Sequence, residues 1–197
     1  MSFLLNNCHF SVLDAAILAS SNSFFCGNPD LDDFFRNEAI LYARELLGKT
    51  YCFIDDKKPS EIVCAFTVSN DSIKTHTLPN SRRKQVAGTI PFAKRKRSYP
   101  AVLVGRLGVN QNYAQKGIGS ELMDFIKTWF VGENNKTGCR FIVVDAYNTT
   151  QTTSFYRKNE FKVMFSSEEQ EKKYFGIAAD ESLMTRLMFF DLIEAIV

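Results

Sequence analysis

Apolar residues recur at near-helical spacing in the first quarter of the chain. Residues 31–43 show this pattern, with Asn28 or Asp30 as the cap and Pro29 in the first turn. Gly48 follows and is expected to close the helix. The pattern therefore predicts a helix over these residues, with its apolar face turned to a core.

The remaining apolar runs predict strands and further helices. The first two runs flank a polar turn at residues 55–59, which predicts an antiparallel hairpin. The predicted strands are residues 50–54, 61–69, 101–109, 140–146, 161–165 and 185–192. The predicted helices are residues 120–131 and 150–158. This order of elements favours an α/β (α+β) fold, with a mixed sheet flanked by helices.

Residues 74–99 break this regular order. They are polar and basic, and Pro79, Gly88 and Pro91 interrupt them, so we expect a long surface excursion rather than packed structure. No repeat or low-complexity segment divides the chain, which at 197 residues is predicted to be a single domain over residues 1–197. Four aromatic residues are expected in the core: Phe24, Phe25, Phe125 and Trp129.

Composition excludes several protein classes. Hydrophobic residues make up 45% and charged residues 23%, which is typical of a globular protein. No apolar run is long enough to span a bilayer, and the first residues do not resemble a signal peptide, so we expect a soluble protein in the cytoplasm. The five cysteines are scattered and only two histidines are present, which argues against both a metal site and a disulfide framework.

Charge is unevenly distributed along the chain. The segment from residue 72 to residue 120 has ten basic residues and no acidic ones, whereas the rest has 14 basic and 22 acidic residues. Such segregation predicts a basic face for an anionic partner. Within it, two clusters are candidate RNA contacts: Arg82, Arg83 and Lys84, and Lys94, Arg95, Lys96 and Arg97. Alternatives are a solvated loop and a contact surface for an acidic protein.

A glycine-containing loop lies between a predicted strand and the predicted helix at 120–131. Gly117 and Gly119 allow the backbone to approach an anion closely, since neither has a Cβ. The N–H groups and the dipole of the helix N-terminus favour an anion there, and Lys116 adds a positive charge. Neither the dinucleotide fingerprint nor the P-loop pattern fits, and an ordinary strand-to-helix turn is the alternative.

The segment Ala114-Gln115-Lys116-Gly117-Ile118-Gly119, with Ser120 after it, resembles the coenzyme A loop of GNAT acetyltransferases, Q/R-x-x-G-x-G/A. Ala114 departs from the first position of that pattern. The resemblance implies a mostly antiparallel GNAT sheet and acetyl-coenzyme A as the acetyl donor. It also implies that residues 115–120 bind the pyrophosphate, and that the strand edge at Leu107, Gly108 and Val109 pairs with the pantetheine arm.

Residues 154–161 resemble the F-Y-x-x-x-G-F segment of the same family, with Glu160 in place of the glycine. The resemblance places Tyr156 beside the thioester sulfur. A phenol, with a reference pKa near ~10, is suited to protonate the departing thiolate. The alternative for Tyr156 is a core aromatic whose hydroxyl finds a partner. No histidine or carboxylate identifies itself as the base for the attacking amine, so a water relay is the default.

Further segments resemble one subgroup, the acetyltransferase toxins of type II toxin–antitoxin modules. The matching residues are Phe25-Cys26-Gly27, Leu31-Asp32, residues 102–107 and Val144-Asp145-Ala146, and the resemblance covers roughly residues 3 to 192. It implies acetylation of the α-amine of aminoacyl-tRNA and a cognate antitoxin; a homodimer is a further candidate assembly. Gly108, where these toxins commonly have alanine, and the lengthened connection at 166–182 indicate a divergent member.

Three functions therefore stay open from the sequence. The first is acetyl transfer to charged tRNA, and the second is acetyl transfer to a small-molecule or protein amine. The third is a non-catalytic module that binds coenzyme A or a partner protein. Arg106, inside an apolar strand, is expected to be paired and structural or to face the active-site cleft.

Overall fold

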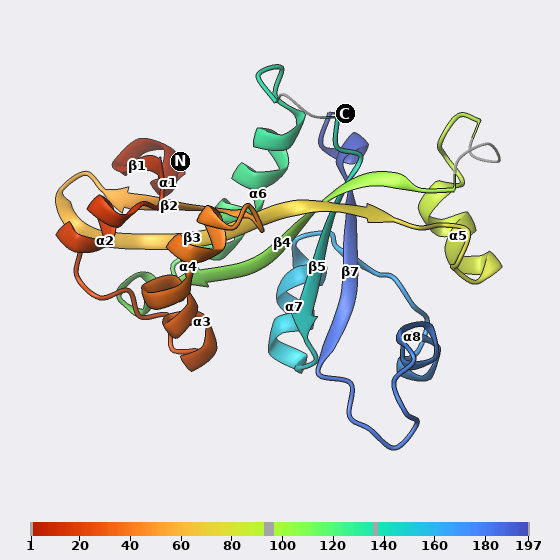
Figure 1. Cartoon of the computed structure of the whole chain (residues 1–197). Coiled ribbons are helices and arrows are strands. Elements are labelled where there is room, and N and C mark those ends of the chain that lie inside the picture. Colours follow the sequence, from red (N-terminus) through yellow and green to blue (C-terminus); the bar gives the residue numbers. More distant parts are fainter. Residues whose placement is uncertain (1, 93–96, 136–137, 197) are drawn as a thin grey trace. The chain divides into compact units, whose positions relative to one another are not determined.

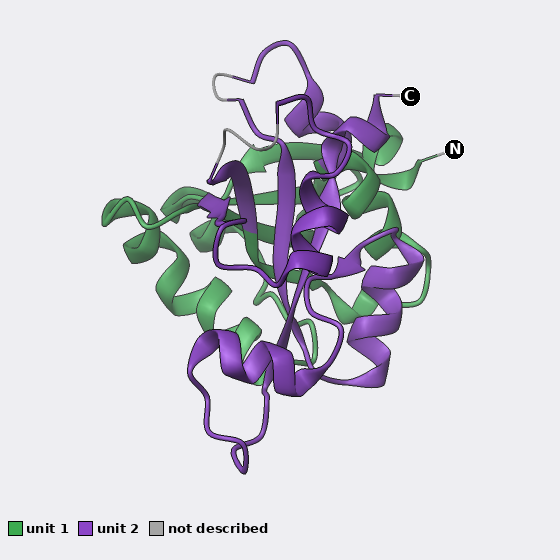
Figure 2. Cartoon of the chain, turned by 90° about the vertical axis from the view of Figure 1, so that its right-hand side faces the viewer, with its two compact units in different colours: residues 1–69, 104–126 green, residues 70–103, 127–197 purple. Residues whose placement is uncertain are grey.

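The computed structural model describes residues 2–92, 97–135 and 138–196 (Figure 1). Two compact units emerge from the packing (Figure 2). Unit 1 comprises residues 1–69 and 104–126, and unit 2 comprises residues 70–103 and 127–197. The single domain over residues 1–197 stays a prediction.

Unit 1 contains the N-terminal elements and the end of one long strand. Its complete elements are α1 (Phe3–Asn7), β1 (Cys8–Val12), α2 (Ala15–Ser20), α3 (Pro29–Asp33), the π-helix η1 (Phe34–Glu38), α4 (Ala39–Arg44), β2 (Lys49–Asp55) and the 3-10 helix η3 (Gln111–Tyr113). It also holds most of β3 (Lys58–Ile73), the end of β4 (Tyr99–Val109) and the start of α6 (Ile118–Val131).

Unit 2 contains the remaining parts of β3, β4 and α6 together with the C-terminal elements. These are α5 (Asn80–Ala87), β5 (Phe141–Tyr147), α7 (Thr150–Lys158), β6 (Lys162–Val163), α8 (Glu168–Phe175), β7 (Thr185–Asp191) and the 3-10 helix η4 (Leu192–Ala195).

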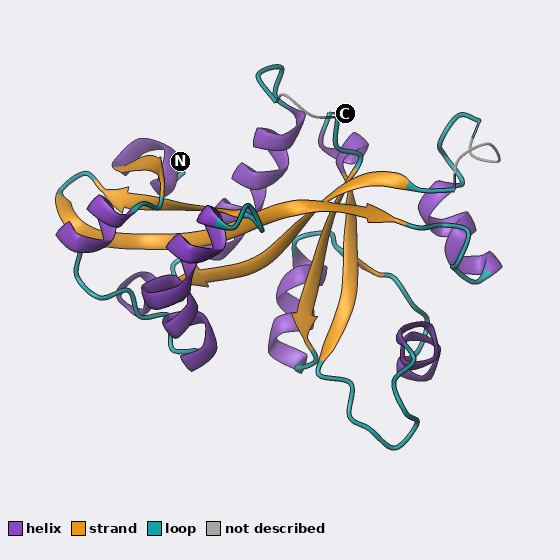
Figure 3. Ribbon diagram, viewed as in Figure 1, coloured by secondary structure: helices purple, strands orange, loops and turns teal. Residues whose placement is uncertain are grey.

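The strands form a seven-stranded sheet in the order β1-β2-β3-β4-β5-β7-β6 (Figure 3). β1 and β2, β2 and β3, β5 and β7, and β6 and β7 pair antiparallel. β4 and β5 pair parallel, with Ala101 opposite Phe141 and Leu103 opposite Val143. The prediction of a mixed, mostly antiparallel sheet flanked by helices is confirmed.

The helix predicted over residues 31–43 is present but divided into α3, η1 and α4. Asn28 caps α3 by accepting hydrogen bonds from the N–H groups of Asp30 and Leu31, at 3.1 and 3.3 Å. The π-helical turn inserts an extra residue, which shifts the helical face. As a result Phe34 and Phe35, adjacent in sequence, are both buried in the core of unit 1.

The surface excursion predicted over residues 74–99 is wrong for part of that segment. α5 occupies residues 80–87, and Leu78, Val86 and Tyr99 are buried in the core of unit 2. These apolar residues of the basic segment turn inward, while Arg83 and Lys84 lie nearer the surface. The predicted RNA contacts Lys94, Arg95 and Lys96 lie outside the described residues.

Other predictions need smaller corrections. The structure adds α1, β1 and α2, which the sequence did not predict, and the predicted strand at 161–165 is reduced to the two residues of β6. Phe24 is buried as expected, but the prediction of Phe25 as a core residue is wrong, since its side chain is 54% exposed. Phe125 and Trp129 are half-buried. No helix in the described ranges is long and apolar enough to cross a bilayer.

The lengthened connection after residue 166 folds into α8. Ser167 caps this helix by accepting from the N–H of Gln170, and Gly176 ends it in the left-handed conformation, with φ of +71°. A buried carboxylate fixes it to β7: Glu171 is 1% exposed, and it accepts from Arg186 Nε at 2.6 Å and from the N–H of Leu187. The inserted segment is therefore an integral part of unit 2.

Glu171→Ala should lower the free energy of unfolding by about 3 kcal/mol, because it leaves the half-buried Leu187 N–H without this acceptor and leaves Arg186 with only the longer contacts to Glu168, at 4.0 Å, and Phe165 O, at 3.5 Å. The matched control is Glu194→Ala. This variant removes the ion pair of Lys162 and Glu194, which are 46% and 43% exposed. Since exposed pairs contribute little, the control should cost less than about 1 kcal/mol. Urea unfolding of both variants measures the difference, and equal losses would contradict a structural role for Glu171.

Candidate functional site

The end of β4 packs closely against the loop before α3. A Cβ placed on Gly108 would lie 3.1 Å from Phe24 Cε1 and 3.2 Å from both Cβ and Sγ of Cys26. These distances are tighter than most Cβ contacts, so alanine at this position requires Phe24 or Cys26 to shift. This packing is the physical reason that glycine suits position 108 in this chain.

Asn110 forms the hydrogen bonds that join the end of β4 to its neighbours. Its main-chain N–H donates to Val63 O at 2.9 Å, and its buried side-chain Nδ2 donates to Ile62 O at 3.0 Å. Its Oδ1 accepts from the N–H of Asn112 at 3.0 Å and so caps η3. One side chain thus links the strand end to β3 and starts the loop that follows.

Gln111 fixes the segment before α3 to the same loop. Its N–H donates to Phe25 O at 2.9 Å, and its Nε2 donates to Cys26 O at 3.0 Å. Gly27 has a φ of +86°, and a Cβ there would lie only 2.2 Å from Gln111 Nε2. The left-handed backbone favours glycine at position 27, and a Cβ there would also displace the Gln111 amide that donates to Cys26 O.

The loop before α6 turns through two left-handed residues. Gln115 and Gly117 have φ values of +60° and +81°. Gly117 O then accepts from the N–H groups of Ser120 and Glu121 at 3.0 and 3.1 Å, which begins the helix. The first N–H groups of a helix have no partner inside it, and the helix dipole favours an anion beside them. A Cβ on Gly117 would meet no atom of the protein within 4 Å, so the space beside the loop is open.

Lys116 is exposed and turns back along the loop. Its Nζ donates to Asn112 O at 2.9 Å and lies 5.5 Å from the ring centroid of Tyr113. Its charge therefore lies within the loop itself. The predicted cofactor residues all belong to unit 1, where β4 leads through η3 and this loop into α6: Leu107, Gly108 and Val109, and residues 115–120.

Tyr156 lies in α7, in unit 2. Its side chain is 8% exposed and packs edge-on against Phe155 and Phe161, at centroid distances of 5.1 and 5.4 Å. Burial, and then the negative charge of Asp145, raise the pKa of the Tyr156 hydroxyl above its usual value near ~10. The phenol therefore keeps its proton throughout the physiological pH range.

Glu160 occupies the position where the resembled motif has glycine, and the backbone conformation at this position explains why glycine is favoured there. Its φ is +68°, in the left-handed region that glycine adopts without steric cost. Its carboxylate accepts a hydrogen bond from Lys127 Nζ at 2.8 Å, and this contact lowers the pKa of Glu160. Lys127 is 5% exposed and lies 4.3 Å from the Phe190 ring centroid, so Glu160 is the carboxylate partner of a buried cation.

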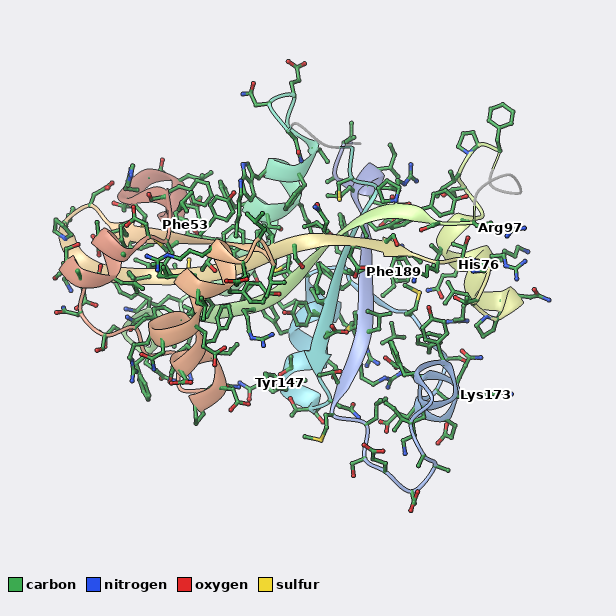
Figure 4. All side chains as sticks on the ribbon, viewed as in Figure 1. Phe53, His76, Arg97, Tyr147, Lys173 and Phe189 are labelled. Carbon is green, nitrogen blue, oxygen red and sulfur yellow. The ribbon has the colours of Figure 1, made fainter. Side chains whose placement is uncertain are left out.

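The basic residues of unit 2 have different surroundings. On α5, Arg82 is half-buried and Lys84 is exposed, while Arg83 donates through Nε to Thr75 O at 3.2 Å. Figure 4 labels Arg97 and His76, which lie next to each other: His76 N–H donates to Arg97 O at 3.4 Å.

Arg106, in unit 1, has a simpler environment than expected. It is exposed, with its guanidinium carbon 5.0 Å above the Phe34 ring, and its Nη1 donates to the carbonyl of the adjacent Gly105 at 2.9 Å. The cation–π contact, rather than a place in an apolar interior, accounts for this arginine in the strand.

Residues 75–163 match the family model described as an acetyltransferase (GNAT) domain. The fold agrees with this match. A tyrosine-to-phenylalanine mutant of KacT has a similar crystal structure, with a TM-score of 0.69 at 16% identity over 96% of this chain and 98% of that one. Over residues 75–163 the chain is therefore similar to GNAT acetyltransferase domains, and its fold is similar to that of KacT.

The chain is also similar to tRNA-acetylating toxins. A tRNA-acetylating toxin of Mycobacterium tuberculosis is 25% identical over 141 residues, which are 72% of this chain and 77% of that protein. AtaT in complex with acetyl-methionyl-tRNAfMet has a similar fold, with a TM-score of 0.63 at 16% identity over 95% and 96% of the two chains. AtaT bound to acetyl-CoA and the C-terminus of the antitoxin AtaR gives a TM-score of 0.60 at 13% identity, with 96% of each chain covered.

Replacing Gly117 by alanine tests the loop. The new Cβ would enter the open space where an anion is expected, so we expect coenzyme A affinity to fall at least about tenfold, measured by calorimetric titration. Gly176 is a matched control, because it too is left-handed and a Cβ added to it would meet no atom within 4 Å. Both alanine variants should lose about 1 kcal/mol of stability. Equal coenzyme A affinity in the two variants would contradict the assignment.

Proposed function

We propose that this chain transfers the acetyl group of acetyl-coenzyme A to the α-amine of an aminoacyl-tRNA, as a toxin held in check by an antitoxin in the cytoplasm. The observation that carries the acetyl-transfer part is the loop at Gln115 and Gly117, which directs a helix N-terminus at open space. The tRNA part is supported by the relatives named above and by the acid-free basic segment.

The loop fits the donor chemically. The pyrophosphate of coenzyme A needs several N–H donors and a close backbone, and residues 115–120 supply both. Gly117 leaves the space beside them open, and Lys116 contributes a positive charge. The backbone edge at Leu107, Gly108 and Val109 is assigned to the pantetheine arm, and an N–H of this edge polarises the thioester carbonyl.

Tyr156 is assigned the role of general acid. Acetyl-coenzyme A supplies an activated thioester, whose carbonyl carbon is attacked by the neutral amine while the carbon–sulfur bond breaks. The Tyr156 hydroxyl is protonated at physiological pH, because burial raises its pKa, and it is the proton source assigned to the departing thiolate. The amine loses its own proton to water, since no side chain of the site has been identified as a base.

The acceptor is assigned from charge. The part of the acid-free segment that the structure describes includes four basic residues suited to binding RNA phosphates: Arg82, Arg83 and Lys84 on α5, and Arg97. A small-molecule or protein amine is the alternative acceptor, and a module without catalysis is the alternative of another class. A homodimer remains a prediction of the sequence.

Tyr156→Phe should lower kcat on the order of 100-fold, since a positioned acid typically contributes this much. The affinity for acetyl-coenzyme A should change little, because the ring and its packing remain. Tyr42→Phe is the control: Tyr42 packs on Phe34 in unit 1 and also keeps its ring. Steady-state kinetics that show wild-type turnover in Tyr156→Phe would return Tyr156 to the role of a core aromatic.

Replacing Arg82, Arg83 and Lys84 by glutamine should weaken tRNA binding and flatten its salt dependence by about 2 to 3 in the slope of log affinity against log salt. Acetylation of a small amine, which makes no phosphate contacts, should be unaffected. Lys49, Lys57 and Lys58 are exposed residues of unit 1, and their replacement by glutamine matches the change in charge. An equal effect of both triple variants on the slope would indicate nonspecific attraction only.

A further inference from the structure

Helix α1 contacts the residues on both sides of the coenzyme A loop. Tyr113 directly precedes residues 114–120, and Glu121 directly follows them. Both residues contact α1, which is itself anchored by Leu4, a side chain with no exposed surface. All of these residues belong to unit 1.

Tyr113 is held from two sides at the start of the loop. Its hydroxyl donates to Asp55 Oδ2 at 2.7 Å, and its ring centroid lies 6.0 Å from that of Phe3. Both Tyr113 and Asp55 are 7% exposed. The other carboxylate oxygen of Asp55 accepts from the N–H of Lys57 at 2.9 Å, so the acceptor is itself fixed. Burial would raise the pKa of Asp55, but the bond from Tyr113 and its other donors lower it.

Glu121 is held at the other end of the loop. Its Oε2 accepts from Ser2 Oγ at 3.0 Å and from the N–H of Leu4 at 3.1 Å. Ser2 also caps α1 by accepting from the N–H of Leu5. Glu121 lies in the first turn of α6, so one carboxylate joins the N-termini of two helices.

We infer that Tyr113 and Glu121 are positioning residues that hold the pyrophosphate-binding loop in its binding conformation. The loop contains two left-handed residues, one of them the non-glycine Gln115, and such a backbone persists only where its surroundings fix it. Fixed ends hold the N–H groups ready for an anion, so less ordering is needed on binding. This inference rests on the proposed assignment of the loop to coenzyme A.

The experiment compares donors with and without a pyrophosphate. In Tyr113→Phe and in Glu121→Ala, calorimetric titration with coenzyme A should show about tenfold weaker binding than in the wild type. With S-acetylpantetheine, a donor that lacks the pyrophosphate, both variants should keep the kcat/KM of the wild type when charged tRNA is the acceptor. Glu121→Gln retains a side-chain acceptor for Ser2 and Leu4 and should restore most of the affinity.

Two results would overturn the inference. One is unchanged coenzyme A affinity in Tyr113→Phe and Glu121→Ala; the other is an equal loss with both donors, which indicates general damage to the unit. Tyr42→Phe, which removes a hydroxyl from α4 of the same unit, should bind coenzyme A as the wild type does. If Tyr113→Phe fails to fold, the pair Glu121→Ala and Glu121→Gln decides alone.

Measurements on the wild-type protein distinguish failure of the proposed function from failure of this inference. A wild-type protein that binds coenzyme A but does not acetylate charged tRNA refutes the acceptor, and the calorimetric comparison still judges the two positioning residues. A wild-type protein that binds no coenzyme A refutes the assignment of the loop, and the inference fails with it.

Discussion

The constraint on which the site depends is the change from extended to helical backbone between β4 and α6. The chain has eight residues, 110–117, in which to end one ladder of hydrogen bonds and begin another. Backbone N–H and C=O groups that leave the strand pairing in these residues need other hydrogen-bond partners wherever they are buried. At the strand end Asn110 donates to Ile62 O and Val63 O and accepts from the N–H of Asn112. At the helix start the Gly117 carbonyl accepts from the N–H groups of Ser120 and Glu121. At the end of this turn a Cβ added to Gly117 would meet no protein atom within 4 Å.

Elements with a strong local pattern were predicted well from the sequence. The helix predicted at residues 150–158 coincides with α7, and the strand predicted at 101–109 differs from β4 by two residues. Short elements escaped prediction because α1 and β1 have five residues each, too few to establish a period. The sequence did not predict α5 because most of its residues are polar or basic, and only two apolar side chains, Val86 and Ala87, are buried by the tertiary structure.

In the candidate site, too, residues in local motifs were predictable from the sequence, whereas contacts between distant residues were not. The glycines of the loop and Tyr156 belong to contiguous motifs, so a sequence pattern suffices to propose them. The contacts that fix the loop join residues far apart: Tyr113 and Asp55 are 58 positions apart, and Gln111 and Cys26 are 85 apart. Nothing in the local sequence of Asp55 or Gln111 indicates these pairings, because each depends on which strands become neighbours in the sheet.

The pair formed by Glu160 and Lys127 has a consequence for how substitutions at the two positions combine. A glycine at position 160 would relax the left-handed backbone but remove one carboxylate that accepts from the buried ammonium of Lys127, and an apolar residue at 127 would remove the same contact while Glu160 stays left-handed. Each single change is thus penalised in the background of the other. The two positions are therefore expected to show epistasis: because both single replacements remove the same contact, the double replacement should cost less than the sum of the two.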